Sequence, residues 1–229
     1  MSVYALIVAA GRSERCAGAV PKQFRPVCGQ PLLAWTISRF ERAASIDKIV
    51  VVVAEENLLY TNSKVVDPYG FSKVIKIVPG GETRADSVLL GLKSLPLSTE
   101  ITAIHDGARP LVTPSDIDKV VTTAKTERAA MLARPATDTV KRVKGGYILS
   151  TLERESLYYA QTPQVFQHDL ILEAHDKRDE KSGITDDAML VEAMGFKVRV
   201  VEPENSNMKV TTPDDLVMVE AILKGETCE

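Results

Sequence analysis

The chain has 229 residues, of which 45% are hydrophobic, and its formal net charge is -3 at pH 7. This length fits one large α/β domain or two small ones, and the composition is that of a globular protein with a sizeable core. The near-balanced charge provides no general attraction for nucleic acid or an anionic membrane, so neither is expected as a partner.

The cysteines and the N-terminus indicate the compartment. Cys16, Cys28 and Cys228 show neither CxxC spacing nor a paired framework, which is typical of a reducing environment. With no histidine near it in sequence, Cys16 is expected to be a packing residue rather than a nucleophile. The apolar run at residues 4–10 is short, lacks a basic leader and ends in glycine, which favours a buried strand over a signal peptide or membrane span. We therefore expect a cytoplasmic protein.

Short β-branched runs alternate with helical stretches along the chain. We expect strands at residues 4–8, 48–53, 73–78, 101–105, 130–133 and 198–201. We expect helices at residues 31–44, 84–95, 114–126, 168–177, 186–194 and 213–223. The alternation predicts an α/β fold with a single doubly wound, mainly parallel sheet covered on both faces.

One segment, residues 139–152, breaks this alternation. Two extended stretches flank Gly145 and Gly146, which is typical of a β-hairpin. The hairpin is too polar and short to add core, so it lies at a sheet edge or projects as an arm. A projecting arm needs something to pack on, and a second subunit is the natural candidate. No repeat or flexible linker divides the chain, so we expect one domain over residues 1–229 with a dimerisation arm at about 138–155.

The first candidate site follows the first predicted strand. The strand stops at Gly11, and a glycine turn there leaves backbone N–H groups free to bind a phosphate chain. The segment matches neither the P-loop nor the GxGxxG pattern. Arg15 and Lys22 follow closely and could curl around a triphosphate. The alternative is a solvated loop with ordinary surface charges.

The second candidate site is the run at residues 80–87. Gly80 and Gly81 allow the backbone to approach a planar base closely, and Ser87 falls on the first turn of the next helix. Cytosine could be recognised there by backbone groups and a hydroxyl. The alternative is a simple loop in which Thr83 caps the helix.

The third candidate site, residues 105–110, directly follows a predicted strand. Ligands of open α/β sheets bind at the carboxyl ends of strands, where Asp106 must lie. Asp106 could accept hydrogen bonds from sugar hydroxyls or help to hold a divalent ion. Arg109 could pair with a phosphate or with Asp106, and a purely structural Asp–Arg turn is the alternative. His105 is expected to be buried beside the sheet rather than catalytic.

Scattered polar residues form a fourth group. Threonines and isolated cations are what a small phosphorylated polyol requires, although each is individually compatible with a helix cap or a surface charge. Asp186 and Asp187 have the character of a helix start. The candidates in this group are Thr139, Arg154, Thr162, Thr185 and Lys209.

Taken together, these motifs resemble the 2-C-methyl-D-erythritol 4-phosphate cytidylyltransferases of the non-mevalonate isoprenoid pathway. The similarity runs from residue 5 to residue 223 and places several independent motifs in the same order. These are AAGxxxR…PKQ (9–23), GGxxRxxS (80–87), HDGARP (105–110), DTxKR (138–142), QTPQ (161–164), TDD (185–187) and NxKxTTPxDL (207–216). Cys16 and Met208 stand where relatives often carry methionine and isoleucine, and neither departure touches the chemistry.

The resemblance implies a Rossmann-like nucleotidyltransferase that uses Mg²⁺, or another divalent ion such as Mn²⁺, and a homodimer interlocked through the arm. It assigns CTP binding to Ala9, Ala10, Gly11, Gly81, Glu82 and Ser87. It assigns acceptor binding to Asp106, Arg109, Thr139, Thr162 and Thr185. It makes Arg15, Lys22, Arg154 and Lys209 catalytic, with Arg154 and Thr185 contributed by the partner subunit.

The implied reaction transfers CMP from CTP to 2-C-methyl-D-erythritol 4-phosphate and releases pyrophosphate. The nucleophile is a phosphate monoester whose second pKa is about 6, so no general base is required. Charge repulsion and alignment form the barrier. Two alternatives remain: a ribitol 5-phosphate cytidylyltransferase, and a non-catalytic nucleotide sensor, against which the retention of Arg15 and Lys22 argues.

Overall fold

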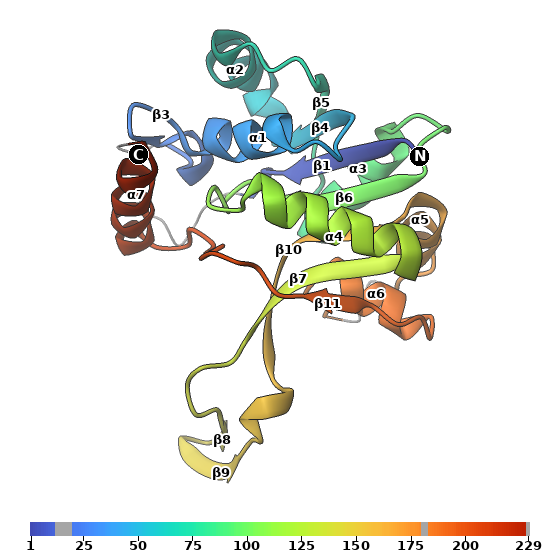
Figure 1. Ribbon diagram of the computed structural model, residues 1–229, viewed down its shortest axis with the longest axis vertical. Helices are drawn as coiled ribbons and strands as arrows, with labels where there is room; N and C mark the ends of the chain where they lie inside the picture. Colours follow the sequence, from blue (N-terminus) through green and yellow to red (C-terminus); the bar gives the residue numbers. More distant parts are fainter. Residues whose placement is uncertain (12–19, 180–182, 228–229) are drawn as a thin grey trace.

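A seven-stranded sheet with the order β11-β7-β10-β6-β1-β4-β5 runs through the computed structural model, which describes residues 1–11, 20–179 and 183–227 (Figure 1). Strand β10 pairs antiparallel with both of its neighbours, and the other pairs are parallel. The predicted mainly parallel sheet is therefore confirmed. Its strands are β1 (Val3–Val8), β4 (Lys48–Val53), β5 (Val74–Pro79), β6 (Ile101–Asp106), β7 (Ala129–Pro135), β10 (Tyr158–Gln167) and β11 (Arg199–Val201).

Helices cover both faces of the sheet. Successive side chains of a strand point to opposite faces, so Ala5 and Ile7 join one buried cluster and Leu6 joins the other. The first cluster includes residues of α1 (Leu32–Arg42) and α4 (Pro114–Glu127). The second includes residues of α3 (Arg84–Ser94), α5 (His168–Asp176) and α6 (Asp187–Ala193). Because both faces are buried, strands such as β4 are almost continuously apolar, and the doubly wound arrangement is confirmed.

Side-chain caps start helices α4 and α6. Thr113 accepts a hydrogen bond from the backbone N–H of Asp116, and Pro114 opens α4. Asp186 caps α6 in the same way by accepting from the N–H of Met189. The last helix, α7 (Pro213–Thr227), also opens with a proline. It packs near the start of α1 and lies on the side toward which the β1 arrow points (Figure 1).

Several elements were not predicted. The longest is β10, which is polar around Gln161 and Thr162 and so lacks the β-branched pattern of the other strands. The others are the short pair β2 (Pro26–Val27) and β3 (Gln30–Pro31), the single turns η1 (Lys22–Phe24) and η5 (Arg154–Ser156), and the helical run η2 (Glu55–Asn57), α2 (Leu58–Thr61), η3 (Asn62–Val66) and η4 (Asp67–Tyr69).

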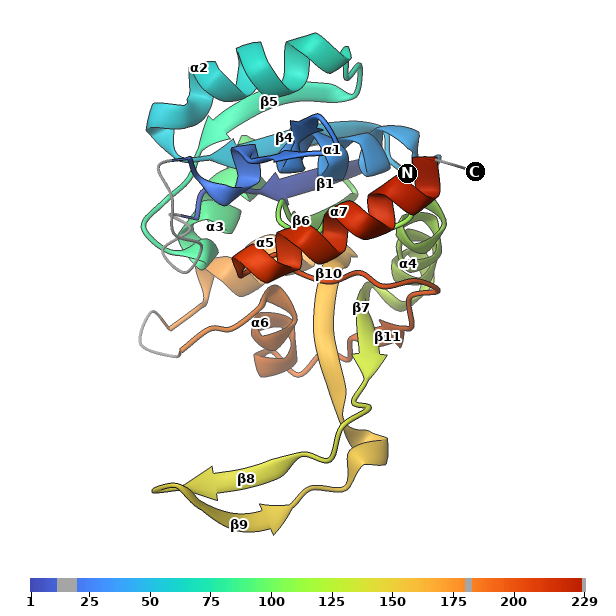
Figure 2. The same ribbon diagram turned by 90° about the vertical axis from the view of Figure 1, so that its left-hand side faces the viewer.

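The predicted hairpin is present and projects from the body of the protein (Figure 2). Strands β8 (Lys141–Lys144) and β9 (Tyr147–Thr151) pair antiparallel, and every residue of both strands is exposed. Gly145 and Gly146 occupy the turn with φ values of 58° and 83°, where a side chain would be strained. Strands β6 and β7 run in the same direction, since both are antiparallel to β10. The arm therefore leaves from the edge at which β6 ends.

No helix in the described part of the chain is long and apolar enough to cross a membrane.

Candidate active site

The segment after β1 lies at the carboxyl edge of the sheet. The backbone N–H of Ala9 donates to the carbonyl of Val52 at 2.7 Å. The side-chain amide of Gln23 donates to the carbonyl of Ala9 at 3.0 Å and to that of Gly11 at 3.4 Å. Gln23 ends the AAGxxxR…PKQ motif, and its side chain therefore fixes the backbone of the AAG run with which the same motif begins. Arg15, the predicted triphosphate ligand, lies outside the described residues.

Close backbone packing joins this segment to two of the other candidate sites. A Cβ atom on Gly80 would lie 2.4 Å from the Cβ of Ala10 and 2.7 Å from the Oγ of Ser87. A Cβ atom on Gly107 would lie 2.8 Å from the Cβ of Ala9. No real Cβ atom tolerates such distances, so glycine is required at both positions. The loops after β1, β5 and β6 thereby meet at one place.

The turn after β5 is tied to the start of α3. The backbone N–H of Gly81 donates to Ser87 Oγ at 3.1 Å, and that hydroxyl donates to the carbonyl of Thr83 at 2.9 Å. Thr83 also caps α3 in a reciprocal capping box with Asp86, so the cap named in the alternative interpretation is present. Ser87 is buried, whereas Glu82 is exposed. A base that lies against this turn would therefore meet a backbone of fixed shape.

Asp106 ends β6, and three cations surround its carboxylate. Lys209 Nζ lies 2.8 Å from Oδ2, Arg109 Nε lies 3.5 Å from the same oxygen, and Arg84 Nε donates to Oδ1 at 3.2 Å. Burial raises the pKa of a carboxyl, but Arg84, Lys209 and Arg109 outweigh it and hold the pKa of Asp106 well below its usual range. The carboxylate is therefore ionised and can accept hydrogen bonds.

A chain of hydrogen bonds fixes the turn that carries Asp106. His105 Nε2 lies 3.1 Å from the carbonyl of Arg109, an acceptor, so Nε2 carries the proton. Burial lowers the pKa of His105 to about 3, so the ring is neutral and Nδ1 accepts. Thr162 donates to Nδ1 at 3.0 Å and accepts from the backbone N–H of Asp106 at 3.0 Å. His105 is thus buried and structural, as expected, and the hydroxyl of Thr162 is engaged within the protein.

The segment before α7 converges on the same place. Arg109 Nη1 donates to the carbonyl of Asn207 at 2.8 Å, and Asn207 Nδ2 donates to the carbonyl of Thr162 at 2.7 Å. Lys22 Nζ donates to the carbonyl of Val210 at 2.9 Å. The structure therefore brings Lys22, Arg109 and Lys209 to the edge where Asp106 lies.

The remaining candidates lie elsewhere on this chain. Thr139 and Arg154 are exposed at the base of the arm, where Arg154 Nη1 donates to the carbonyl of Thr137 at 2.8 Å. Thr185 is exposed and its hydroxyl contacts the sulfur of Met189 at 3.8 Å. None of these described hydrogen bonds reaches Asp106.

Sequence reasoning missed a buried ion network behind Asp106. Arg84 Nη2 lies 2.8 Å from Asp187 Oδ2, and His175 Nε2 lies 3.1 Å from Asp187 Oδ1. The neighbouring acid Asp86 pairs with Arg178 instead. Arg84 stands within the GGxxRxxS motif and Asp187 within TDD, but nothing in the sequence says that these two motifs touch.

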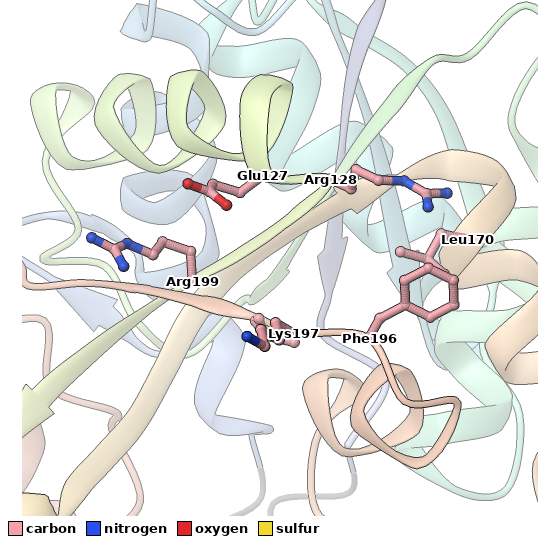
Figure 3. A pocket seen from close by; sticks show the side chains of 7 residues that line it. Glu127, Arg128, Leu170, Phe196, Lys197 and Arg199 are labelled. Carbon is pink, nitrogen blue, oxygen red and sulfur yellow. The ribbon is translucent and has the colours of Figure 1, made fainter.

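A cavity of about 250 Å³ lies at the opposite edge of the sheet, where β7 and β11 begin (Figure 3). Arg128 donates to Gln167 Oε1 at 2.7 Å and lies over the ring of Phe196 at 5.0 Å. Figure 3 shows the guanidinium groups of Arg128 and Arg199 pointing away from each other. These charges do not converge on one ligand, so we place the candidate site at Asp106.

Comparisons with known proteins identify the family to which the chain is similar. The model of the IspD family, 2-C-methyl-D-erythritol 4-phosphate cytidylyltransferase, matches residues 3–225. A protein of that name from Geobacter metallireducens is 42% identical over 228 residues, which cover 98% of each chain. Another from Pelotomaculum thermopropionicum is 43% identical over 225 residues, 97% of this chain and 94% of that one. The crystal structure of 4-diphosphocytidyl-2C-methyl-D-erythritol synthase from Anaerococcus prevotii superposes with a TM-score of 0.85 at 29% identity and covers 97% of this chain and 96% of its own.

Proposed function

The chain belongs to the 2-C-methyl-D-erythritol 4-phosphate cytidylyltransferase family, and on that premise we propose that it is the enzyme that transfers CMP from CTP to this acceptor. The products are 4-diphosphocytidyl-2-C-methyl-D-erythritol and pyrophosphate, and the reaction serves isoprenoid precursor synthesis. The observation that carries the proposal is the ionised Asp106, which lies with Lys209 and Arg109 beside the glycine-packed loops. The matches do not favour a ribitol 5-phosphate enzyme.

The packed loops form the nucleotide half of the site. Ala9, Ala10 and Gly11 line the nucleotide, and Gly81, Glu82 and Ser87 read the cytosine. The tight contact between Gly80 and Ala10 supports this assignment, because it leaves backbone rather than side chain at the surface of the turn. Backbone N–H groups near Gly11 suit the phosphates.

The charged cluster forms the acceptor half. Asp106 accepts hydrogen bonds from the hydroxyl groups of the acceptor substrate, and Arg109 and Lys209 bind the phosphate of that substrate. The side chain of Lys209 is 38% exposed, which leaves it accessible to an incoming phosphate. Thr162 holds the backbone of Asp106, and Thr139 and Thr185 complete the acceptor contacts.

The chemistry is an in-line displacement. An oxygen of the acceptor phosphate forms a bond to the α-phosphorus of CTP, while the bond from that phosphorus to the bridging oxygen breaks and pyrophosphate leaves with the electron pair. Arg15 and Lys22 offset the charge that develops, and Arg154 and Lys209 align the nucleophile. Lys22 is well placed for this role because it reaches the carbonyl of Val210, next to Lys209.

A divalent ion, Mg²⁺ or Mn²⁺, accompanies CTP in this proposal. The described residues contain no cluster of three or more His, Cys, Asp or Glu side chains that could hold a metal ion, and the carboxylate of Asp106 is already paired with three cations. The ion would be held mainly by the phosphates of CTP and would offset part of their negative charge.

The arm supports a proposed homodimer. Val143, Tyr147, Ile148 and Leu149 are each between 55% and 79% exposed, an unusual concentration of large apolar side chains on a two-stranded hairpin. We propose one domain over residues 1–229, with an arm at about 138–155 that packs on a second copy and carries Arg154 to its site, which Thr185 also completes across the interface. Mixing inactive Lys22→Ala and Arg154→Ala proteins under subunit exchange would then restore activity. If demonstrated exchange restored none, the composite site would be wrong.

The activity itself is tested by incubating the purified protein with CTP, Mg²⁺ and 2-C-methyl-D-erythritol 4-phosphate. We expect pyrophosphate release that depends on the acceptor. A nucleotide sensor would bind CTP without release, and that result would overturn the proposal. The three cysteines show neither CxxC spacing nor a paired framework in the sequence, which supports a reducing compartment, and we place the enzyme in the cytoplasm with no nucleic-acid or membrane partner.

A further inference from the structure

Arg84 joins two carboxylates that belong to different elements. It is the first residue of α3 and therefore follows the proposed cytosine turn directly. Its Nε donates to Asp106 Oδ1 at 3.2 Å, and its Nη2 lies 2.8 Å from Asp187 Oδ2. One guanidinium thus spans the gap between the end of β6 and the start of α6.

The far end of this bridge is fixed from several directions. The Asp187 side chain is only 1% exposed, and His175 Nε2 donates to its Oδ1 at 3.1 Å. The backbone N–H of Asp187 donates to Gln164 Oε1 at 3.0 Å. A buried carboxylate is costly unless it is paired, so Arg84 is held firmly by Asp187.

The near end of the bridge is the carboxylate of Asp106, whose two oxygens have different cationic partners. Lys209 and Arg109 attract Asp106 Oδ2, whereas Arg84 holds Oδ1. Without Arg84, the carboxylate would be free to turn toward the two cations that the acceptor phosphate requires. The fork of an arginine can hold Asp106 and Asp187 at once, whereas the single ammonium of a lysine cannot span both.

We propose that Arg84 is a positioning residue that couples the nucleotide turn to the acceptor pocket by fixing Asp106 and the first residue of α6. This inference rests on the proposed function, because Asp106 is given a role there as an acceptor ligand. Arg84 acts through Asp106 and does not touch substrate. Small misplacements of such groups cost on the order of 100-fold in rate.

The test measures KM for each substrate, kcat and the melting temperature of five variants beside the wild type. Arg84→Gln should lower kcat/KM for the acceptor by about 10- to 100-fold and change the KM of CTP by less than about 3-fold. Arg84→Lys should remain impaired, because it keeps the charge but not the fork. Asp187→Asn should shift acceptor kinetics in the same direction, and adding it to Arg84→Gln should cause little further loss.

Arg178→Gln is the matched control. Arg178 also pairs with an aspartate of α3, Asp86, and its side chain is 10% exposed, but its described contacts do not reach Asp106. It should lower the melting temperature and leave acceptor kinetics near wild type.

The following results would overturn the proposal. Wild-type acceptor kinetics in Arg84→Gln, with a melting temperature lowered as in Arg178→Gln, would make Arg84 merely structural. An equal rise in the KM of CTP would assign it to the nucleotide. If Arg84→Gln fails to fold, Arg84→Lys and Asp187→Asn decide, and normal acceptor kinetics in both would refute the coupling. A wild type without turnover would refute the proposed function and this inference with it, whereas normal wild-type turnover confines a failure to Arg84.

Discussion

The hydroxyl of Thr162 donates to Nδ1 of His105 at 3.0 Å, and the same oxygen accepts the backbone N–H of Asp106. Strand β10 thereby locks the end of the neighbouring strand β6 at the residue that carries the acidic side chain. The position of Asp106 depends on a buried neutral histidine and a threonine that no substrate has to touch.

Thr162→Val should break this lock. It leaves Nδ1 of His105 and the N–H of Asp106 without a partner, which should cost about 1–3 kcal/mol in the free energy of unfolding. Urea unfolding measures the stability and pyrophosphate release measures the turnover, which should fall. Thr102→Val is the control, because Thr102 lies near the start of β6, away from the site, where its Oγ1 is 2.9 Å from Nδ1 of His168, the first residue of α5. Equal turnover in both variants would contradict the role of Thr162.

Stability should fall in mild acid because of His105. Its pKa in the folded protein is about 3, below the ordinary value of about 6.5, so the unfolded chain binds more protons between these values. The contribution of His105 to the free energy of unfolding should therefore be fully present above about pH 6.5. Below that pH, the free energy of unfolding should fall by at most about 1.4 kcal/mol per pH unit. The pKa values of Asp106 and Asp187 are lowered in the folded protein, so protonation of these carboxylates reduces the free energy of unfolding only below about pH 4.

Urea unfolding at about pH 7.5, 6 and 5 measures this slope. Burial also lowers the pKa of His168, so His168→Gln serves as the control and should keep most of the slope. His105→Gln should lose most of it. A wild-type stability that is flat over this range would show that His105 is not buried as a neutral ring.

Gly80→Ala should disable the nucleotide half. The added methyl group would lie 2.4 Å from the Cβ of Ala10 and 2.7 Å from Ser87 Oγ, so the turn must move. CTP affinity, measured by calorimetry, should fall by more than about 10-fold, since displaced backbone donors lose their partners. Gly225→Ala, in α7, where nothing lies within 4 Å of the added atom and φ is not in the left-handed region, is the control and should bind CTP normally. Normal binding by Gly80→Ala would remove this turn from the base pocket.

Lys22→Ala should lower kcat by on the order of 100-fold while CTP affinity changes less, because a preorganised charge acts mainly in the transition state. Single-turnover kinetics with saturating CTP measure the chemical step. Lys93→Ala, whose exposed partner is Asp176, controls for the loss of one positive charge. Arg15→Ala should behave like Lys22→Ala. Near-normal turnover in either variant would remove that residue from catalysis.

Local sequence patterns predicted the strands and helices whose residues are apolar on the expected period. Strand β10 was not predicted because Gln161, Thr162 and Gln164 place polar side chains inside the sheet, where backbone N–H groups of Asp106 and Asp187 donate to Thr162 and Gln164. The placement of Asp106 followed from the rule that parallel strands end at one edge.

The pairing of Arg84 with Asp187 could not be predicted in this way. It depends on how α3 and α6 pack on the same face of the sheet, and the local sequence around neither residue identifies its partner. The cap by Thr83 was predictable, because all of its partners lie within one helical turn.

The roles given to all these residues follow from one reaction, the transfer of CMP to 2-C-methyl-D-erythritol 4-phosphate. The most direct measurement is phosphorus NMR of a single reaction that contains the wild-type protein, CTP, Mg²⁺ and equal amounts of this acceptor and ribitol 5-phosphate. We expect the methylerythritol monoester signal to disappear first and to be replaced by the signals of a diphosphate diester and pyrophosphate. Faster consumption of ribitol 5-phosphate, or no loss of either monoester, would contradict it.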